Sequence, residues 1–396
     1  MKVYNPFFLI FGLAVCCMVS CTDDVDRTVV HYTEDEYDVL SEVLDLPLEL
    51  HDYGQERSNF INFGGGLFAG SESNDIFSMK NISRNHQATL GRVLFYDTKL
   101  SVNNTVSCGS CHQQLLAFAD DVAFSEGFDG ELSFRNSLPL GNTVGFETAY
   151  GGSSFGRALF GWDEANRDIS SQSEAAITSS VEMGMHDMNA LVTKLRTDEV
   201  YKVLFKKAFG TSTIHKEDLL LSLDKFINSI VSNNSKFDEE ALNNRGQSIS
   251  QLDIPFKGYT DSENRGKALY NSNCASCHSM DHTRTTLATA NNGLDLEYSD
   301  KGRYNVTSDL SDRGVFKIPF LRNIELTAPY MHDGRFETLE EVVEHYATGI
   351  KNHENKHPLL DEIKVTSEDK ADLVAYLKTL TDPELTSDLK WSDPFK

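Results

Sequence analysis

Two short motifs carry the residues in this sequence that are best suited to chemistry. Each has two cysteines three positions apart and a histidine directly after the second; they are Cys108, Cys111 and His112, and Cys274, Cys277 and His278. This spacing is the attachment signature of haem c, in which two thiols bond to one edge of a porphyrin. The adjacent histidine can then bind the iron. The sequence therefore predicts two covalently bound haem c groups, with His112 and His278 as proximal ligands.

Two other chemistries use the same cysteine spacing. Two such pairs can build a tetrahedral zinc site with four cysteines, and one pair can form a redox-active disulfide in a thioredoxin-like fold. The histidine behind both pairs argues against zinc. No alternation of strands and helices surrounds either motif, which argues against the thioredoxin-like fold.

The charge balance limits the partners. Lys and Arg number 36 and Asp and Glu number 60, so the formal charge is 36 − 60 = −24. Binding to nucleic acid needs a cationic face that replaces the counterions of the phosphates, so we expect no nucleic-acid partner. An acidic surface suits a positively charged protein partner.

The N-terminus has the features of an export signal. Phe7 to Ser20 is an apolar run after Lys2, too short to span a bilayer and typical of a secretory signal. Cys21 follows directly and precedes polar residues, as in a bacterial lipobox, which predicts lipidation of Cys21 and a lipid-anchored periplasmic protein. An ordinary secretory signal is the alternative. No later apolar run reaches the length of a transmembrane helix, so we expect membrane contact through the anchor only.

The elements around the motifs predict a mostly α-helical protein. Apolar residues recur at helical spacing in several stretches, including Met188–Leu195, Leu219–Val231 and Ser367–Leu380. Helices and loops follow a similar order around each motif, which indicates two similar units. The predicted organisation is a signal peptide at 1–20, an acidic extension at 21–80, a haem domain at 81–245, a linker at 246–260 and a second haem domain at 261–396.

Ordered sequence blocks between Leu90 and Leu380 resemble the bacterial di-haem cytochrome c peroxidase and MauG family. They are Leu90–Asp97, Phe118–Asp120, Arg135–Asn136, Gly161–Asp163, Glu182–Gly184, Lys317–Pro319, Leu321–Ile324 and Leu326–Arg335. The resemblance implies two cytochrome c-like helical domains, each with one haem, facing across an interface. The N-terminal haem would react with peroxide, and the C-terminal haem would relay electrons.

The resemblance also implies roles for single residues. Glu182 matches the family's acid/base above the peroxidatic haem, and Gln172 matches a neighbouring residue that can hydrogen-bond bound peroxide. Trp162 matches a tryptophan between the haems that helps electrons to cross. Asn136, Thr327 and Pro329 match the positions that hold one calcium ion between the domains. Without the resemblance, Glu182 and Gln172 would be interpreted as exposed polar residues on a helix, and Trp162 as a core residue. The calcium candidates would be interpreted as turn-forming loop residues; they are Asn136, Thr327 and Pro329.

Two departures from the inactive-resting peroxidases concern the iron ligands. Their loop after the first motif carries a histidine that caps the iron, whereas Ser125–Phe134 contains none. We therefore expect an open or water-bound iron at the first haem, as in the MauG branch. Tyr346 aligns with the tyrosine that this branch uses as the sixth ligand of the second haem, and His345 and Met331 are its rivals.

These features predict a periplasmic di-haem cytochrome c peroxidase that reduces hydrogen peroxide to water. Its electrons would come from a small donor such as a cytochrome c, and a homodimer is a further expectation. One alternative is a MauG-like oxidase of a protein or small organic substrate, which Tyr346 and the missing loop histidine favour. The other is a non-enzymatic di-haem electron carrier, against which Glu182 and the uncapped iron argue.

Overall fold

The computed structural model describes residues 32–53, 79–143, 160–243, 252–282 and 285–396, with side chains from residue 82 onward in the second range. The predicted signal peptide and Cys21 lie outside these residues. The helices are α1 (Glu34–Ser41), α2 (Met79–Tyr96), α3 (Cys108–Cys111), α5 (Ile169–Thr178), α6 (Met188–Leu195), α7 (Glu199–Phe209), α8 (Lys216–Ile227), α9 (Lys236–Asn243), α10 (Asp261–Asn273), α11 (Ala275–His278), α12 (Tyr304–Thr307), α13 (Leu339–Glu344) and α14 (Lys370–Lys378). Strands β1 (Thr289–Ala290) and β2 (Phe316–Lys317) pair antiparallel. The predicted mostly α-helical class is confirmed.

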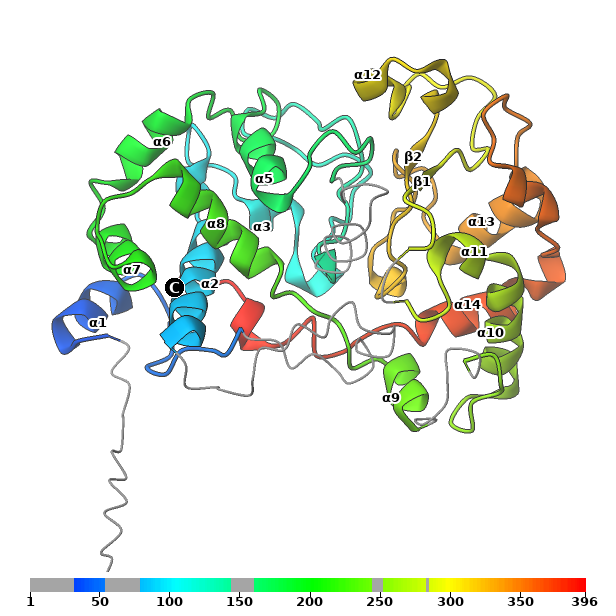
Figure 1. The fold of residues 1–396 in the computed structure, drawn as a ribbon, viewed down its shortest axis with the longest axis horizontal. Helices are drawn as coiled ribbons and strands as arrows, with labels where there is room; N and C mark the ends of the chain where they lie inside the picture. Colours follow the sequence, from blue (N-terminus) through cyan, green and yellow to red (C-terminus); the bar gives the residue numbers. More distant parts are fainter. Residues whose placement is uncertain (1–31, 54–78, 144–159, 244–251, 283–284) are drawn as a thin grey trace, which may run out of the picture.

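Two helical halves lie side by side, each with its own apolar core (Figure 1). In the N-terminal half α2 crosses α8 so closely that a Cβ on Gly91 would lie 1.9 Å from the carbonyl oxygen of Ser222. In the C-terminal half α10 meets α14 in the same way, and a Cβ on Gly266 would lie 1.9 Å from the carbonyl oxygen of Asp372. A glycine thus brings two backbones together in the helix that precedes each haem motif. The repeated layout confirms the prediction of two similar units.

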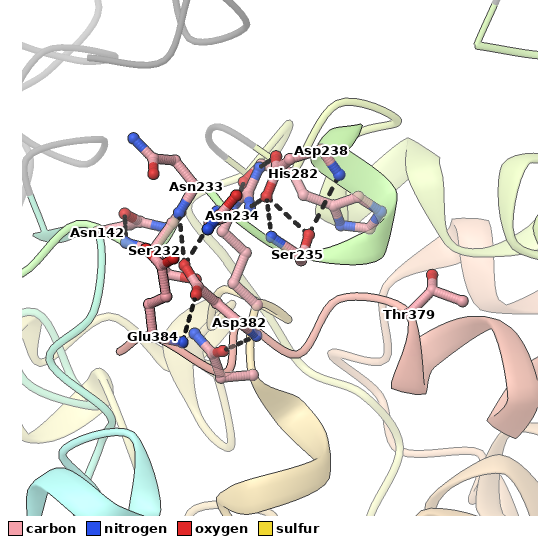
Figure 2. Close-up of polar contacts among 12 residues, drawn as sticks. Asn142, Ser232, Asn233, Asn234, Ser235, Asp238, His282, Thr379, Asp382 and Glu384 are labelled. Carbon is pink, nitrogen blue, oxygen red and sulfur yellow. Dashed lines mark hydrogen bonds and ion pairs between the residues drawn. The ribbon is translucent and has the colours of Figure 1, made fainter. Parts of the chain in front are cut away.

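The chain passes between the halves at Ser232–Ser235. Backbone N–H groups of Asn233 and Asn234 donate to one carboxylate oxygen of Asp382, at 2.9 and 3.0 Å (Figure 2). Asn142 and Ser232 exchange two further hydrogen bonds, of 2.9 and 3.0 Å. Buried backbone groups therefore find partners where the chain leaves regular structure.

Residues after this passage already belong to the second core. Phe237 and Ala241 of α9 pack there, together with Leu252 and Phe256. The helix α9 therefore packs with the second core, although the predicted organisation assigns its residues to the first haem domain. The linker at 246–260 stays a prediction. A polar, Gly- and Pro-containing composition indicated a linker, but Leu252, Phe256 and Tyr259 of that segment are buried, whereas Ile254 is 42% exposed.

The last residues return to the N-terminal half. We call residues 382–396 the C-terminal strap; it leaves α14 and ends beside α2 (Figure 1). Trp391 on the strap is 4% exposed within the first core, and its carbonyl oxygen accepts a 2.7 Å hydrogen bond from the hydroxyl of Tyr96. Gln114, beside the first haem motif, donates to the carbonyl oxygens of Leu385 and Asp388. The strap therefore covers the N-terminal half close to its haem site.

The N-terminal extension also packs on this half. Leu40 and Leu44 of the segment that contains α1 are buried in the first core. Leu44 forms an isolated β-bridge with Phe395 of the strap. Among the described helices, none combines the length and apolarity that a membrane span requires.

Candidate active site

The first haem motif forms one helical turn in the wall of a cavity of about 880 Å³. The N–H of His112 donates to the carbonyl oxygen of Cys108 at 2.9 Å and ends the turn. Nδ1 of His112 donates to the carbonyl oxygen of Phe118 at 2.9 Å, which fixes the orientation and tautomer of the ring. Burial lowers the pKa of His112, although the bond to Phe118 opposes the shift. The imidazole is therefore neutral and keeps Nε2 as the basic nitrogen that can bind a metal.

Neither cysteine of this turn forms a disulfide within the described residues, and both line the same cavity. Burial raises the pKa of Cys108 to about 12 and that of Cys111 to about 11. The remaining wall is mostly apolar and includes Phe95, Phe160 and Phe320. Two thiols, a neutral imidazole and a large apolar cavity fit a covalently attached porphyrin and its iron.

The second motif repeats this arrangement in a second cavity, which Cys274, Cys277 and His278 line. Nδ1 of His278 donates to the carbonyl oxygen of Pro319 at 3.1 Å. Burial lowers the pKa of His278 to about 4, against the opposing effect of that bond. This donor set fits a second haem c.

Glu182 brings a carboxyl group to the first cavity. Its backbone carbonyl accepts a 2.9 Å hydrogen bond from the N–H of Phe128, so the loop Ser125–Phe134 supports it. The side chain is exposed because it opens onto the cavity, but protein atoms crowd around its carboxyl group. This partial burial raises the pKa of Glu182 to about 7. A carboxyl group with such a pKa can both accept and donate a proton near neutral pH.

Gln172 lies on α5 and lines the same cavity. The side chain of Asp168 caps the start of this helix by accepting a 2.7 Å hydrogen bond from the N–H of Ser171. Oε1 of Gln172 accepts a 2.9 Å bond from Nδ2 of Asn166. The side-chain NH₂ of Gln172 can therefore serve as a donor to a molecule in the cavity.

Trp162 lines both cavities. Its Nε1 donates to the carbonyl oxygen of Asn136 at 2.8 Å, and its own carbonyl oxygen accepts a 2.7 Å bond from the N–H of Lys317. The indole is thus fixed between the two haem sites by both halves of the chain.

The described wall of the first cavity contains a single imidazole. Among the described residues that line this cavity, His112 is the only histidine. The loop Ser125–Phe134 closes on itself through a bridge between Glu126 and Leu132. This arrangement agrees with the expectation that no loop histidine caps the first iron.

The structure separates the three candidates for the sixth ligand of the second iron. Tyr346 and Met331 line the second cavity together with His278, but His345 lines a different surface pocket. Tyr346 stands on a π-helical turn, His345–Gly349, that follows α13, and such turns are frequent at functional sites. Burial raises the pKa of Tyr346 to about 12, although a hydrogen bond from Asn292 opposes the shift. This geometry favours Tyr346 and Met331 over His345.

The three residues predicted to hold calcium all line the second cavity; they are Asn136, Thr327 and Pro329. Nδ2 of Asn136 donates to the carbonyl oxygen of Val122 at 3.2 Å, which leaves its Oδ1 as an available acceptor. An amide oxygen and two backbone carbonyls suit Ca²⁺. The calcium site stays a prediction.

One buried ion pair beside these sites was not anticipated from the sequence. Nζ of Lys317 lies 3.8 Å from Oε1 of Glu164, and both side chains are almost fully buried. Burial lowers the pKa of Lys317 to about 8, while Glu164 opposes the shift. Lys317 lines both cavities, where its positive charge can balance an acidic group of a bound cofactor. A lysine in a short strand is usually solvated, so no sequence pattern indicated this position.

A second group of charges joins the two halves across the mouth of the first cavity. The guanidinium of Arg135 contacts Asp163 at 2.7 Å and Asp300 at 2.6 Å. Asp300 belongs to the C-terminal half, so the pair closes the interface beside the cavity. The sequence blocks contain Arg135 and Asp163, but their spacing does not reveal Asp300 as a partner.

Comparisons with known proteins agree with this geometry. The family model described as di-haem cytochrome c peroxidase matches residues 85–246, and the model described as cytochrome c matches residues 263–381. The methylamine utilization protein MauG of Methylorubrum extorquens is 31% identical over 303 residues, covering 74% of this chain and 78% of that protein. The cytochrome c551 peroxidase of Nitrosomonas europaea is 31% identical over 300 residues, covering 74% and 79%.

Solved structures show the same fold. A MauG-like protein associated with microbial copper homeostasis has a TM-score of 0.67 and 31% identity, covering 78% of this chain and 93% of that chain. The di-haem peroxidase BthA from Burkholderia thailandensis has a TM-score of 0.59 and 20% identity, covering 78% and 89%. Two cytochrome c-type domains with complete attachment motifs imply two haem c groups. The chain therefore belongs to the di-haem cytochrome c peroxidase and MauG family of enzymes.

Proposed function

We propose that the protein is a periplasmic di-haem peroxidase that reduces hydrogen peroxide to water with electrons from a small cytochrome-type donor. The observation that carries this proposal is the Glu182 carboxyl group, which opens onto the cavity of Cys108, Cys111 and His112. A pure electron carrier needs neither an acid/base group nor a cavity on the distal side of its haem.

The haem bound at His112 would supply the iron that binds peroxide and accepts its oxidising equivalents. Glu182 would accept a proton from one oxygen of the peroxide and donate it to the other oxygen, which leaves as water. The Gln172 NH₂ group donates a hydrogen bond that orients the peroxide. Trp162 provides an aromatic path between the two cavities, and His112 and His278 would hold the two cofactors.

The acid/base role predicts a pH dependence. Hydrogen peroxide is neutral at ordinary pH, so Glu182 must be a carboxylate when it accepts the first proton. Its pKa is raised to about 7, so the carboxylate fraction grows as the pH rises through that value. We expect the second-order rate constant with peroxide to rise about tenfold per pH unit well below 7 and to level off above it. Stopped-flow measurements between pH 5 and pH 9 test this; a flat profile would contradict the assignment.

A substitution at Gly127 should also affect the Glu182 carboxyl group, by changing its position. A Cβ at this position would lie 1.7 Å from the carbonyl oxygen of Val181, the residue before Glu182. We expect Gly127→Ala to displace Glu182, to slow the peroxide reaction, and to cost about 1–3 kcal/mol of stability through overpacking. The control is Gly141→Ala, whose nearest contact would lie at 3.8 Å, and which should change neither quantity. Equal rates in both variants would show that the loop does not position Glu182.

A MauG-like oxidase of a protein or small organic substrate is the second candidate. Two observations favour it: the described wall of the first cavity offers no capping imidazole, and Tyr346 lines the cavity of His278. A phenolate is a strong anionic ligand and favours oxidised states of the second iron.

One experiment separates the candidates. Peroxide is added to the purified ferric holoprotein while the Soret band is followed, and reduced cytochrome c is then added. The peroxidase predicts rapid donor oxidation over many turnovers. A long-lived oxidised species with slow donor oxidation would support the oxidase instead, and no spectral reaction with peroxide would exclude both.

The sequence also supports a proposal for the cellular location of the enzyme and for the charge of its electron donor. Lipidation of Cys21 after export would place the enzyme at a membrane surface in the periplasm. The formal charge of −24 suits a donor with a basic face. Donor oxidation should therefore slow as ionic strength rises.

A further inference from the structure

Two buried tyrosines stand one behind the other at the wall of the second cavity. Tyr270 lies on α10 and lines that cavity, and Tyr376 lies on α14, the neighbouring helix (Figure 1). Their ring centroids are 5.1 Å apart, which is ring contact. The close crossing of the helices at Gly266 makes this contact possible, since a Cβ there would lie 2.8 Å from the Cβ of Tyr376.

The hydroxyl of Tyr376 has a basic nitrogen beside it. Nε2 of His282 lies 2.8 Å from the Tyr376 hydroxyl oxygen, and both side chains are buried. Two aromatic rings hold the imidazole in place. Phe237 meets it at 4.9 Å with an interplanar angle of 90°, and Tyr270 meets it at 4.9 Å. The base therefore has a fixed position next to the phenol.

The surrounding hydrogen bonds decide which of the two groups is the donor. The hydroxyl of Tyr270 donates to the carbonyl oxygen of Ser279 at 2.9 Å, so its oxygen can only accept from His282. Nδ1 of His282 faces that oxygen at 3.5 Å and therefore carries the ring proton. Nε2 is then the acceptor for the Tyr376 hydroxyl. The opposite assignment would leave the buried Tyr376 O–H without an acceptor among the described residues.

A tyrosine with such a base is suited to one-electron chemistry. A phenol that loses an electron becomes a strong acid, so its oxidation is easier when a base takes the proton in the same step. Tyr376 would release one electron and pass its phenol proton to Nε2 of His282. A neutral tyrosyl radical then stands beside a protonated imidazole. One electron from a donor, together with the return of the same proton, restores the phenol.

The neighbouring tyrosines lack such a base. The Tyr270 hydroxyl donates to a backbone carbonyl, and that of Tyr259 donates to Oγ1 of Thr379 at 2.7 Å; neither acceptor readily binds an extra proton. The ring of Tyr259 lies 6.4 Å from that of Tyr376, but Nζ of Lys236 stands 5.2 Å from the Tyr259 centroid. A positive charge over a ring disfavours the loss of an electron from it. Within this group, the oxidised state is therefore most stable on Tyr376.

We propose that Tyr376 is a redox-active tyrosine that takes up one oxidising equivalent from the second cofactor cavity when no donor electron arrives. The inference rests on the proposed reaction with hydrogen peroxide and adds a site on the protein where one equivalent is held. Hydrogen peroxide accepts two electrons and two protons to form two waters, and Tyr376 supplies one of those electrons. The electron reaches the cavity by a short step through Tyr270, whose ring contacts both.

The test uses the full-length ferric holoprotein, mixed with hydrogen peroxide in the absence of a donor and frozen rapidly. Electron paramagnetic resonance should show an organic radical in the wild type. Ring-deuterated tyrosine should narrow its hyperfine pattern, and isotopic labelling of the histidine nitrogens should change a nitrogen coupling that comes from His282. Tyr376→Phe should lose the radical signal, because phenylalanine has no phenol proton to give to the base.

Tyr201→Phe is the matched control. Tyr201 is also buried, and its hydroxyl donates to the carboxylate of Asp97 at 2.6 Å, so it has a base as well. Its described ring contact is with Phe205, which lines neither cavity. This variant should keep the wild-type radical signal. Haem content and thermal unfolding show whether each variant is folded.

The outcomes separate this inference from the proposed function. If peroxide causes no change in the Soret band, the proposed function fails and this inference fails with it. If the Soret band responds but no tyrosine radical forms, or if the radical survives in Tyr376→Phe, only the role of Tyr376 is overturned. Should Tyr376→Phe fail to fold, the labelled wild type decides, because a radical without a histidine nitrogen coupling does not lie beside His282.

Discussion

Glu182→Gln should lower the rate of the reaction with hydrogen peroxide by about 10²–10⁴-fold, the usual effect of removing a general acid/base. Glutamine has nearly the same size but cannot carry a proton between the two peroxide oxygens. Stopped-flow absorbance of the ferric protein measures the rate directly. Both haems should stay attached. Within the described structure, the carboxyl group of Glu182 forms no hydrogen bond to a cysteine or histidine of either motif.

The same variant should also abolish the rise in rate near pH 7. Haem content, measured by the pyridine haemochrome spectrum, and thermal stability serve as controls for intact folding. Gln172→Leu provides a graded comparison, because loss of a neutral donor should cost less than loss of the proton carrier. An unchanged rate in Glu182→Gln would remove this residue from the mechanism.

Asp238→Asn should have the largest effect on stability, about 3–5 kcal/mol, because it leaves the buried charge of Arg322 without its counterion. The two side chains are 1% and 2% exposed and are joined by two hydrogen bonds of 2.8 Å. Arg322 also donates to the carbonyl oxygen of His282 at 2.9 Å. Figure 2 shows Asp238 close to Ser235, at the passage between the halves. Urea unfolding of the holoprotein measures the loss.

An exposed pair provides the control. Lys202 and Glu199 on α7 lie 2.6 Å apart, but their side chains are 39% and 69% exposed. Glu199→Gln should therefore cost less than about 1 kcal/mol. A similar loss in both variants would mean that burial does not decide the strength of the Asp238 pair.

The Asp238 pair also has a pH signature. Burial alone would raise the pKa of Asp238, but Arg322 and the hydrogen bonds from Ser235 outweigh it and hold the pKa below its ordinary value. A carboxyl group with a lowered pKa stabilises the fold above its unfolded-state pKa, and this contribution fades as the pH falls through the lowered value. The stability difference between wild type and Asp238→Asn should therefore shrink in acid.

The sequence predicted those parts of the site that depend on local order. Cys108, Cys111 and His112 need only a single turn to converge, and the second motif repeats that turn. The predicted bounds of a helix match the observed bounds where apolar residues repeat regularly. The helix α6 spans Met188–Leu195, as predicted. The short helix α9 buries only Phe237, Asp238 and Ala241, so its apolar repeat is too brief to predict a helix from the sequence.

Contacts between distant segments of the chain could not be predicted from the sequence. Nδ2 of Asn292 donates to the sulfur of Met331, which lies 39 residues later in the chain. No local pattern relates an asparagine after a short strand to a methionine in a distant turn. Lys317 and Glu164 likewise become partners only when the halves meet. Such pairs depend on the tertiary arrangement, which spacing alone does not encode.

The C-terminal strap has a consequence for how far the two halves can separate. Trp391 enters the core of the N-terminal half, and its Nε1 donates to the carbonyl oxygen of Ser229 at 3.1 Å. The strap continues from the helix α14 of the other half, so a large opening of the interface would pull this indole out of an apolar interior. Because exposing a buried aromatic side chain costs free energy, the strap acts as a tether that opposes hinge motion between the halves.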